Sequence, residues 1–219
     1  MAIAHAVVAN TSAFVPGNIA VNADGWTASG DTGFAVSNLD RQGGGVRLVT
    51  DGTDNDCGAI VWGGQSISVG TVGARFGFSA KIKGTEGSTD KQDWFVGLSD
   101  IYDNTFFGDT DTLASMDAIG VYKVSGSMFF RTCVLNAAAQ SGETTTIAFA
   151  SATEYSLRVE GEVNTTGITV RFYINEVLVD TVTDVSTTGF TDMAPVVALS
   201  NGSANAETFN TYSFVPYGA

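Results

Sequence analysis

The segments Glu154-Tyr-Ser-Leu-Arg-Val-Glu160 and Ile168-Thr-Val-Arg-Phe-Tyr-Ile174 alternate apolar and polar residues along their whole length. Because successive side chains of a β-strand point to opposite faces, the apolar residues of each segment share one face. The polar pair Asn175-Glu176 then turns the chain into Val177-Leu-Val-Asp-Thr-Val182. The sequence therefore predicts consecutive antiparallel strands, each with one buried face.

Further strands are predicted on both sides of these segments. Toward the C-terminus they cover Pro195-Val-Val-Ala-Leu199 and the segment from Thr208 to Val215. Upstream, Arg75 to Lys83 alternates strictly, and Trp94-Phe-Val-Gly-Leu-Ser-Asp100 is predicted as another strand. We expect roughly twelve to fourteen short strands in the chain, which is typical of a two-sheet sandwich.

The composition favours one folded domain of this class. Of the 219 residues, 44% are apolar and 15% are charged, which is ample for a hydrophobic core. We expect residues 1–38 to form an extended N-terminal arm with the first strand, and residues 39–219 to form the sandwich. The net charge of −13 repels nucleic acid and anionic membrane surfaces, so neither is an expected partner.

Three short motifs carry a resemblance to a known superfamily. They are Tyr155-x-Leu-x-Val159, Val170-Arg-Phe-Tyr-Ile-Asn175 and Phe95-Val-Gly-Leu98. Together they resemble strands of the concanavalin A-like lectin and laminin-G superfamily, over roughly Gly45 to Val215. The resemblance implies an all-β fold, a two-sheet antiparallel jelly-roll sandwich. This superfamily serves glycosidases, sugar-binding lectins and structural virion modules, so the residues of the site must decide the function.

Catalytic residues are not evident in this sequence. Laminarinase-like glycosidases of the superfamily carry Glu-x-Asp-x-x-Glu on one strand, and no such string occurs here. The nearest candidates, Glu160 and Glu162, lead into a turn, where solvated acids are ordinary. His5 is the single histidine and has no nearby acidic or cysteine partner, which argues against a catalytic triad. We therefore expect a protein that is not an enzyme.

The two cysteines, Cys57 and Cys133, have no metal-ligand spacing. Free cysteine is among the most buried residue types, so the first interpretation is two buried thiols. A disulfide between them is the alternative.

Acidic turns are the weak candidates for a metal site, and calcium is the cofactor that the resemblance leaves open. Asp51, Asp54 and Asp56 lie in one turn, and Asp100, Asp103, Asp109 and Asp111 lie in a second loop. Neither follows the spacing of a calcium-binding loop. Aspartate is also an ordinary turn residue, which is the alternative explanation, and no cofactor is otherwise predicted.

The second acidic loop also holds an aromatic cluster. Tyr102, Asn104 and Phe106 supply the aromatic and amide groups that a sugar-binding site needs. The alternatives are that the aromatic residues pack beneath a long loop or form a protein interface.

Between Asp109 and Ala118, the apolar residues Leu113 and Met116 are three positions apart, which favours a single helical turn.

The first functional hypothesis is a bacteriophage capsid decoration or cement protein, which resembles other members of the superfamily found in virions. Its N-terminal arm and one edge of the sandwich would dock on the major capsid protein or another virion protein, with many moderate contacts adding avidity. We expect the docking residues of the arm to be His5, Val7, Val8, Phe14, Val15 and Pro16.

The segment from Met1 to Val8 is short and lacks a basic leading region, so no signal peptide is predicted. The expected location is the virion, after synthesis in the host cytoplasm. The alternative function is a carbohydrate-binding module of a phage fibre or cell surface, with a glycan as partner, and a degenerate glycosidase is the third. Self-association into a homo-oligomer remains open.

Overall fold

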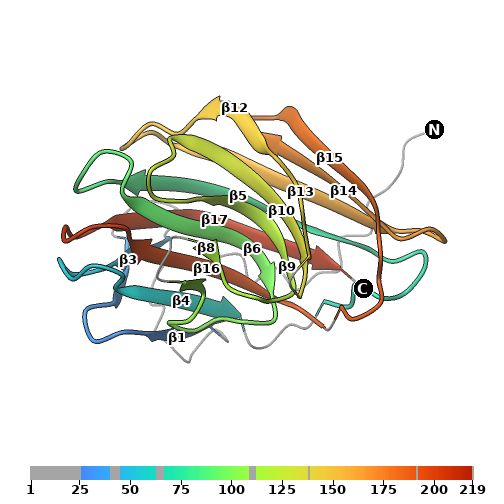
Figure 1. The fold of residues 1–219 in the computed structure, drawn as a ribbon, viewed down its shortest axis with the longest axis horizontal. Helices are drawn as coiled ribbons and strands as arrows, with labels where there is room; N and C mark the ends of the chain where they lie inside the picture. Colours follow the sequence, from blue (N-terminus) through green and yellow to red (C-terminus); the bar gives the residue numbers. More distant parts are fainter. Residues whose placement is uncertain are drawn as a thin grey trace.

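Two antiparallel β-sheets pack face to face in the computed structural model (Figure 1). The structure describes residues 26–39, 45–62, 67–108, 112–137, 139–190 and 192–218. Sheet A, in front in Figure 1, contains in spatial order β1 (Trp26–Gly30), β4 (Cys57–Trp62), β16 (Ala194–Asn201), β6 (Gln92–Ser99), β9 (Ala118–Lys123), β10 (Phe129–Asn136) and β11 (Ala139–Ser141), and β12 (Thr144–Ala148) also pairs with β10.

Sheet B lies behind sheet A. Its strands are, in spatial order, β15 (Val177–Val185), β14 (Ile168–Ile174), β13 (Tyr155–Val163), β5 (Arg75–Thr85), β17 (Thr208–Gly218), β3 (Val46–Val49) and β2 (Ala35–Asn38). A small separate hairpin joins β7 (Phe107–Gly108) to β8 (Thr112–Leu113). Many sheet neighbours are far apart in sequence, such as β17 beside β5 and β16 beside β4.

The predicted fold class is confirmed, since the described residues form an all-β, two-sheet sandwich. They form seventeen strands, more than expected, because short strands such as β7, β8 and β11 carry no recognisable period. The helical turn predicted from Asp109 to Ala118 is wrong in its described part, where Leu113 pairs with Phe107 in the small hairpin. Residues 1–25, which include the whole predicted docking arm, lie outside the described residues. No helix in the described part of the chain is long and apolar enough to cross a membrane.

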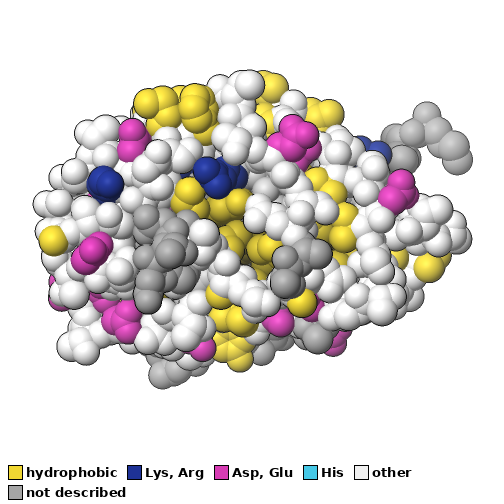
Figure 2. Space-filling model, in the orientation of Figure 1, with side chains coloured by type: hydrophobic (Ala, Val, Ile, Leu, Met, Phe, Trp, Pro, Cys, Tyr) yellow, Lys and Arg dark blue, Asp and Glu magenta, His cyan; other side chains and the backbone are white. Residues whose placement is uncertain are grey.

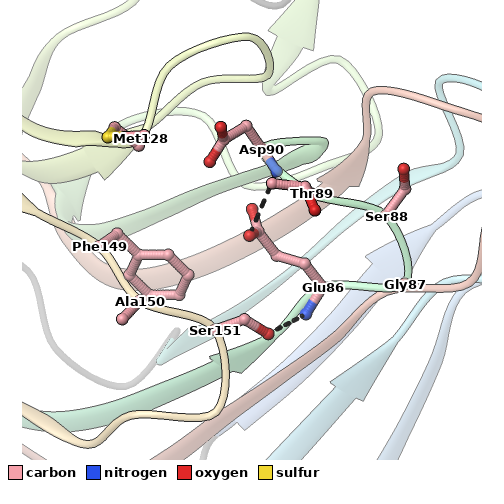
Figure 3. A pocket seen from close by; sticks show the side chains of 9 residues that line it. All are labelled: Glu86, Gly87, Ser88, Thr89, Asp90, Met128, Phe149, Ala150 and Ser151. Atoms are coloured by element: carbon pink, nitrogen blue, oxygen red, sulfur yellow. Dashed lines mark hydrogen bonds between the residues drawn. The ribbon is translucent and has the colours of Figure 1, made fainter.

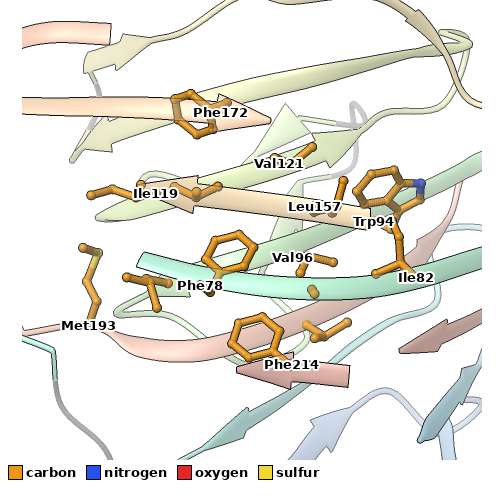
Figure 4. Close-up of a cluster of buried hydrophobic side chains, with 14 of the residues drawn as sticks. Phe78, Ile82, Trp94, Val96, Ile119, Val121, Leu157, Phe172, Met193 and Phe214 are labelled. Atoms are coloured by element: carbon orange, nitrogen blue, oxygen red, sulfur yellow. The ribbon is translucent and has the colours of Figure 1, made fainter. Parts of the chain in front are cut away.

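The main core lies between the two sheets and is rich in aromatic side chains. Phe78 of β5 stacks on Phe214 of β17 with 5.1 Å between ring centroids. Trp94 of β6 is fully buried at one end of this core (Figure 4). Its ring centroid lies 5.3–5.7 Å from those of Phe130, Phe149 and Phe209.

The two sheets differ in how their outer faces are covered. Strands β13 and β14 of sheet B alternate buried and more exposed residues, as the sequence predicts. Strands β4, β6 and β9 of sheet A are buried at every position. Sheet A is therefore covered on both faces, and a second apolar cluster lies on its outer side.

Both cysteines are free and buried in this outer cluster, which confirms the first of the two interpretations. Burial raises the pKa of the Cys57 thiol to about 11 and that of the Cys133 thiol to about 12. Both thiols therefore stay protonated at neutral pH and are poor nucleophiles.

We expect Phe78→Ala to lower the free energy of unfolding by about 3–5 kcal/mol, because it removes a fully buried ring and leaves a cavity. Urea denaturation of the parent and variant measures the change. Val72→Ala, at a mostly exposed position, is the control and should change stability by less than about 0.5 kcal/mol. A loss below about 1 kcal/mol in Phe78→Ala would contradict the packing described here.

Candidate ligand-binding site

Between β6 and β9, the described residues 100–108 and 112–117 fold over the outer face of sheet A. Phe106 and Phe107 belong to the outer apolar cluster, and the Phe106 ring centroid lies 4.8 Å from that of Phe95 on β6. The base of the loop is closed where the Asp117 backbone N–H donates to the Asp100 carboxylate at 2.9 Å. Burial raises the pKa of Asp100, while this hydrogen bond acts in the opposite direction. The loop is thus fixed to the sheet at its apolar centre and at its base.

Anchoring the loop leaves Tyr102 exposed, with 45% of its surface accessible. The Asn104 amide nearby donates to the Asp31 carboxylate, with 2.7 Å between Nδ2 and Oδ1. Asp31 lies in the turn after β1, and its other oxygen accepts the Cys57 backbone N–H at 3.1 Å. An aromatic ring, an amide and a carboxylate therefore lie on two neighbouring loops at one edge of sheet A.

Phe106, the third predicted sugar-binding residue, is fully buried. Its ring contacts Phe95 and Phe107 and has no exposed face to offer a sugar. It packs beneath the loop, as in the alternative that the sequence left open. Of the three predicted sugar-binding residues, Tyr102 and Asn104 therefore remain the candidates.

The acidic turn between β3 and β4 holds the predicted metal candidates. The Asp51 backbone N–H donates to the Asp56 carboxylate at 3.0 Å, and the Thr53 N–H donates to the Asp51 carboxylate at 2.6 Å. Asp54 is exposed in the same turn. Burial raises the pKa of Asp56, and the charges of Asp51 and Asp31 raise it further.

These carboxylates accept backbone N–H groups and brace the turn. Among the described residues, no three His, Cys, Asp or Glu side chains are placed to share a metal ion. Calcium binding at this turn therefore stays a prediction.

A second polar group lies higher on the outer face of sheet A. The Gln140 amide donates to the Tyr122 hydroxyl at 2.7 Å, and Arg131 of β10 lies opposite Tyr122 of β9. The Nε of Arg131 is buried and has no hydrogen-bond partner in the structure. Figure 2 shows a hollow on this face, with hydrophobic side chains at its floor and basic side chains at its upper edge. Polar donors thus border an apolar floor.

A cleft of about 670 Å³ opens at one end of the sandwich (Figure 3). The Asp90 backbone N–H donates to the Glu86 carboxylate at 3.3 Å, and the Glu86 N–H donates to the Ser151 hydroxyl at 3.0 Å. The cleft is lined by Glu86, Gly87, Ser88, Thr89, Asp90, Met128, Phe149, Ala150 and Ser151.

A buried charged cluster lies directly behind this cleft. The Lys123 ammonium pairs with the Glu86 carboxylate at 2.8 Å, with both side chains almost fully buried. Lys123 also donates to the Gln92 carbonyl at 3.0 Å. Glu207 is fully buried beside them and accepts the Gly87 N–H at 2.9 Å, but its Oε1 has no partner in the structure. The group links the loop over residues 86–91 to the strands behind it.

The pKa of Glu207 is raised to about 7. Burial is the main cause, and the Gly87 hydrogen bond opposes it. The negative charge of Glu86 raises the pKa further, while Lys123 lowers it. Glu207 therefore takes up its proton at a higher pH than an exposed glutamate does.

Neither this cluster nor the Tyr122 group is predicted by the sequence. One signal was present for Lys123, because it follows Ile119 and Val121 at the same two-residue spacing and so occupies an inward position. No local signal marks Glu207 or Arg131, since their partners come from distant strands.

Glu160 and Glu162 lie on the outer face of sheet B, on the other side of the sandwich from the outer cluster. Glu160 pairs with Arg158, and Glu162 pairs with Arg75 at 3.7 Å. These contacts support the interpretation of both as solvated acids.

No protein-family model matches this chain, and no curated protein matches its sequence. Its similarity to solved structures is nevertheless extensive. Peanut lectin with a nine-residue peptide matches with a TM-score of 0.66 and 13% identity, over 94% of this chain and 96% of that one. A legume lectin-like domain from Entamoeba histolytica matches with a TM-score of 0.58 and 12% identity, over 88% and 89%. The Emp46p carbohydrate recognition domain, in a potassium-bound form, matches with a TM-score of 0.55 and 13% identity, over 88% of each chain.

At these identities the likeness shows the fold, which is that of the legume lectins and their relatives. The predicted concanavalin A-like jelly roll is thus confirmed. The virion context predicted from the sequence receives no test from these comparisons.

Glu207→Gln is expected to flatten the pH dependence of stability. The folded protein binds this proton more tightly than the unfolded chain, so stability falls as pH rises from about 4.5 to about 7 and then levels off. The variant should be more stable than the parent at pH 8, with the difference shrinking toward pH 5. Urea midpoints at four pH values measure this.

The matched control for this experiment is Glu176→Gln, at an exposed side chain, which should follow the parent curve. Equal slopes for Glu207→Gln and the parent between pH 5 and pH 7 would show that Glu207 titrates normally.

Proposed function

We propose that this protein is a glycan-binding module that acts without catalysing a reaction. The observation that carries the proposal is the exposed Tyr102 ring on the loop whose Asn104 amide is fixed by Asp31 at the edge of sheet A. The fold, which this chain has in common with lectins and a carbohydrate recognition domain, supports it.

The chemistry of this edge suits a sugar. An exposed aromatic ring packs against the apolar C–H face of a pyranose, and amide and carboxylate groups exchange hydrogen bonds with its hydroxyls. The Asn104–Asp31 hydrogen bond holds the amide in one orientation before a ligand arrives, which reduces the ordering cost of binding. Phe106 beneath the loop limits its movement further.

Tyr122, Arg131 and Gln140 lie on the same outer face of sheet A. A glycan of several sugar units that contacts Tyr102 and continues along the outer face of sheet A would reach the polar side chains of Tyr122, Arg131 and Gln140. We propose this group as a further part of the binding surface, with Tyr102 and Asn104 as its primary contacts.

Binding without catalysis is favoured over glycoside hydrolysis by the position of the acids. Glu160 and Glu162 lie on the opposite sheet and are paired with arginines. Docking on a virion through the N-terminal arm stays a prediction, because the arm lies outside the described residues.

A glycan array probed with the purified protein tests the proposal. We expect selective signal for the parent and a loss of about tenfold or more in affinity for Tyr102→Ala and for Asn104→Ala, since each removes a direct contact. Val72→Ala, at another exposed apolar residue, is the control that should bind like the parent. Absence of selective signal for the parent, or parent-like binding by both variants, would reject this assignment.

A further inference from the structure

The basic residues of this acidic protein gather on one face. The chain has 10 lysines and arginines against 23 acids. Six of the 10 lie at outward positions of sheet B, on strands β3, β5, β13 and β14: Arg47, Arg75, Lys81, Lys83, Arg158 and Arg171. On these four strands the outward bases outnumber the outward acids, which are Glu160 and Glu162 of β13.

Only part of this positive charge is neutralised by neighbouring carboxylates. Arg75 and Lys81 each contact a glutamate, and Arg158 contacts two. Among the described residues, no ion pair involves Lys83 or Arg171. Arg171 lies opposite Glu160 of β13, whose carboxylate already contacts Arg158 and Tyr173, so Lys83 and Arg171 are the bases of this face that can take an anionic partner.

An exposed tyrosine ring lies flat on the same face. Tyr217 of β17 is opposite Gly77 of β5, and its hydroxyl donates to the Val159 carbonyl of β13 at 3.2 Å. The ring therefore crosses β5 at Gly77. A Cβ at Gly77 would lie 2.6 Å from the Tyr217 hydroxyl oxygen, so only glycine permits this position. The outer side of the ring, with 41% of the residue exposed, forms a planar platform.

A second planar group stands two strands away from Tyr217. The Arg158 guanidinium lies 3.7 Å from the centroid of the Tyr173 ring, and Glu160 accepts hydrogen bonds from both residues. Pairing across the sheet places Arg171, Glu160, Gly77 and Tyr217 in one row. The backbones of Arg171 and Tyr217 are three strand spacings apart, about 14 Å. Lys83 lies six positions beyond Gly77 on β5, about 20 Å along the strand. A ligand that contacts both Tyr217 and Lys83 must therefore be a chain rather than a single small molecule.

We propose that the outer face of sheet B binds an anionic polysaccharide. One of its sugar rings stacks on Tyr217, and its carboxylates pair with Arg171 and Lys83. The flat face of a sugar ring can stack on the Tyr217 ring. The carboxylates of the chain can pair with the basic side chains on the outer face of sheet B. An acidic peptide would satisfy the charges but gains nothing from the flat ring, so the platform favours a sugar. This surface is separate from the Tyr102 edge, and either can fail without the other.

Affinity measurements on the full chain with polygalacturonate, a neutral galactan and poly-L-glutamate test this proposal. We expect the parent to bind polygalacturonate more tightly than either control polymer. Tyr217→Ala should weaken polygalacturonate binding about tenfold, whereas Tyr217→Phe, which keeps the ring, should stay within about threefold. Tyr102→Ala should bind polygalacturonate like the parent, which separates this surface from the one proposed above.

The charge contribution is tested by the double variant Lys83→Gln with Arg171→Gln. It should bind polygalacturonate more weakly and with less dependence on salt. Lys91→Gln, outside sheet B, is the matched charge control and should bind like the parent. Thermal unfolding of every variant establishes that the fold is retained.

Three results would overturn the proposal. The first is no binding of polygalacturonate by the parent. The second is equal binding of poly-L-glutamate with no effect of Tyr217→Ala, which would indicate simple charge attraction. The third is a change in oligomeric state in Tyr217→Ala with unchanged polysaccharide binding, which would assign the face to a second copy of this chain.

Discussion

The structure depends on the burial of sheet A on both of its faces. Strands β4, β6 and β9 have no exposed position, so their outer apolar residues need a cover as much as their inner ones do. Phe106 and Phe107, in the chain between β6 and β9, supply part of that cover. Because these two rings pack on the sheet, the polar residues that precede them in the loop, including Tyr102 and Asn104, are held at the edge of sheet A. The position of Tyr102 and Asn104 thus follows from a packing requirement.

Sheet B shows the opposite distribution. Its inner residues form the core with Trp94 and its neighbours, while its outer residues alternate with them and meet solvent. The alternation leaves room for charged side chains without any cost to the core, and the bases of the chain gather there. The sandwich therefore presents two chemically different faces, one apolar with polar borders and one basic with a flat tyrosine. Each suits a different kind of ligand.

At the end of the sandwich that carries the cleft, the charged side chains of Lys123 and Glu86 are buried beside the core. Lys123 occupies an inward position of β9, where an unpaired charge would be very costly. Glu86 pairs with it and Gln92 accepts a second hydrogen bond, so the strand can end with a charged residue. Breaking a buried pair of this kind typically costs about 3–5 kcal/mol. The cluster therefore ties the loop over residues 86–91 to sheet A.

The sequence by itself determined the fold class and most strands, because the alternation of apolar and polar residues is visible within single segments such as Tyr155–Val163. The resemblance of its short motifs to the superfamily also predicted the jelly-roll fold, which the structural neighbours confirm. The exposure of each aromatic residue was decided only by tertiary structure: Tyr102 and Phe106 lie in one loop, yet one is exposed and the other buried. Likewise, Tyr217 reaches Gly77 only because distant strands pair. Local pattern fixes which residues share a face, whereas contacts between strands far apart in the chain fix what covers that face.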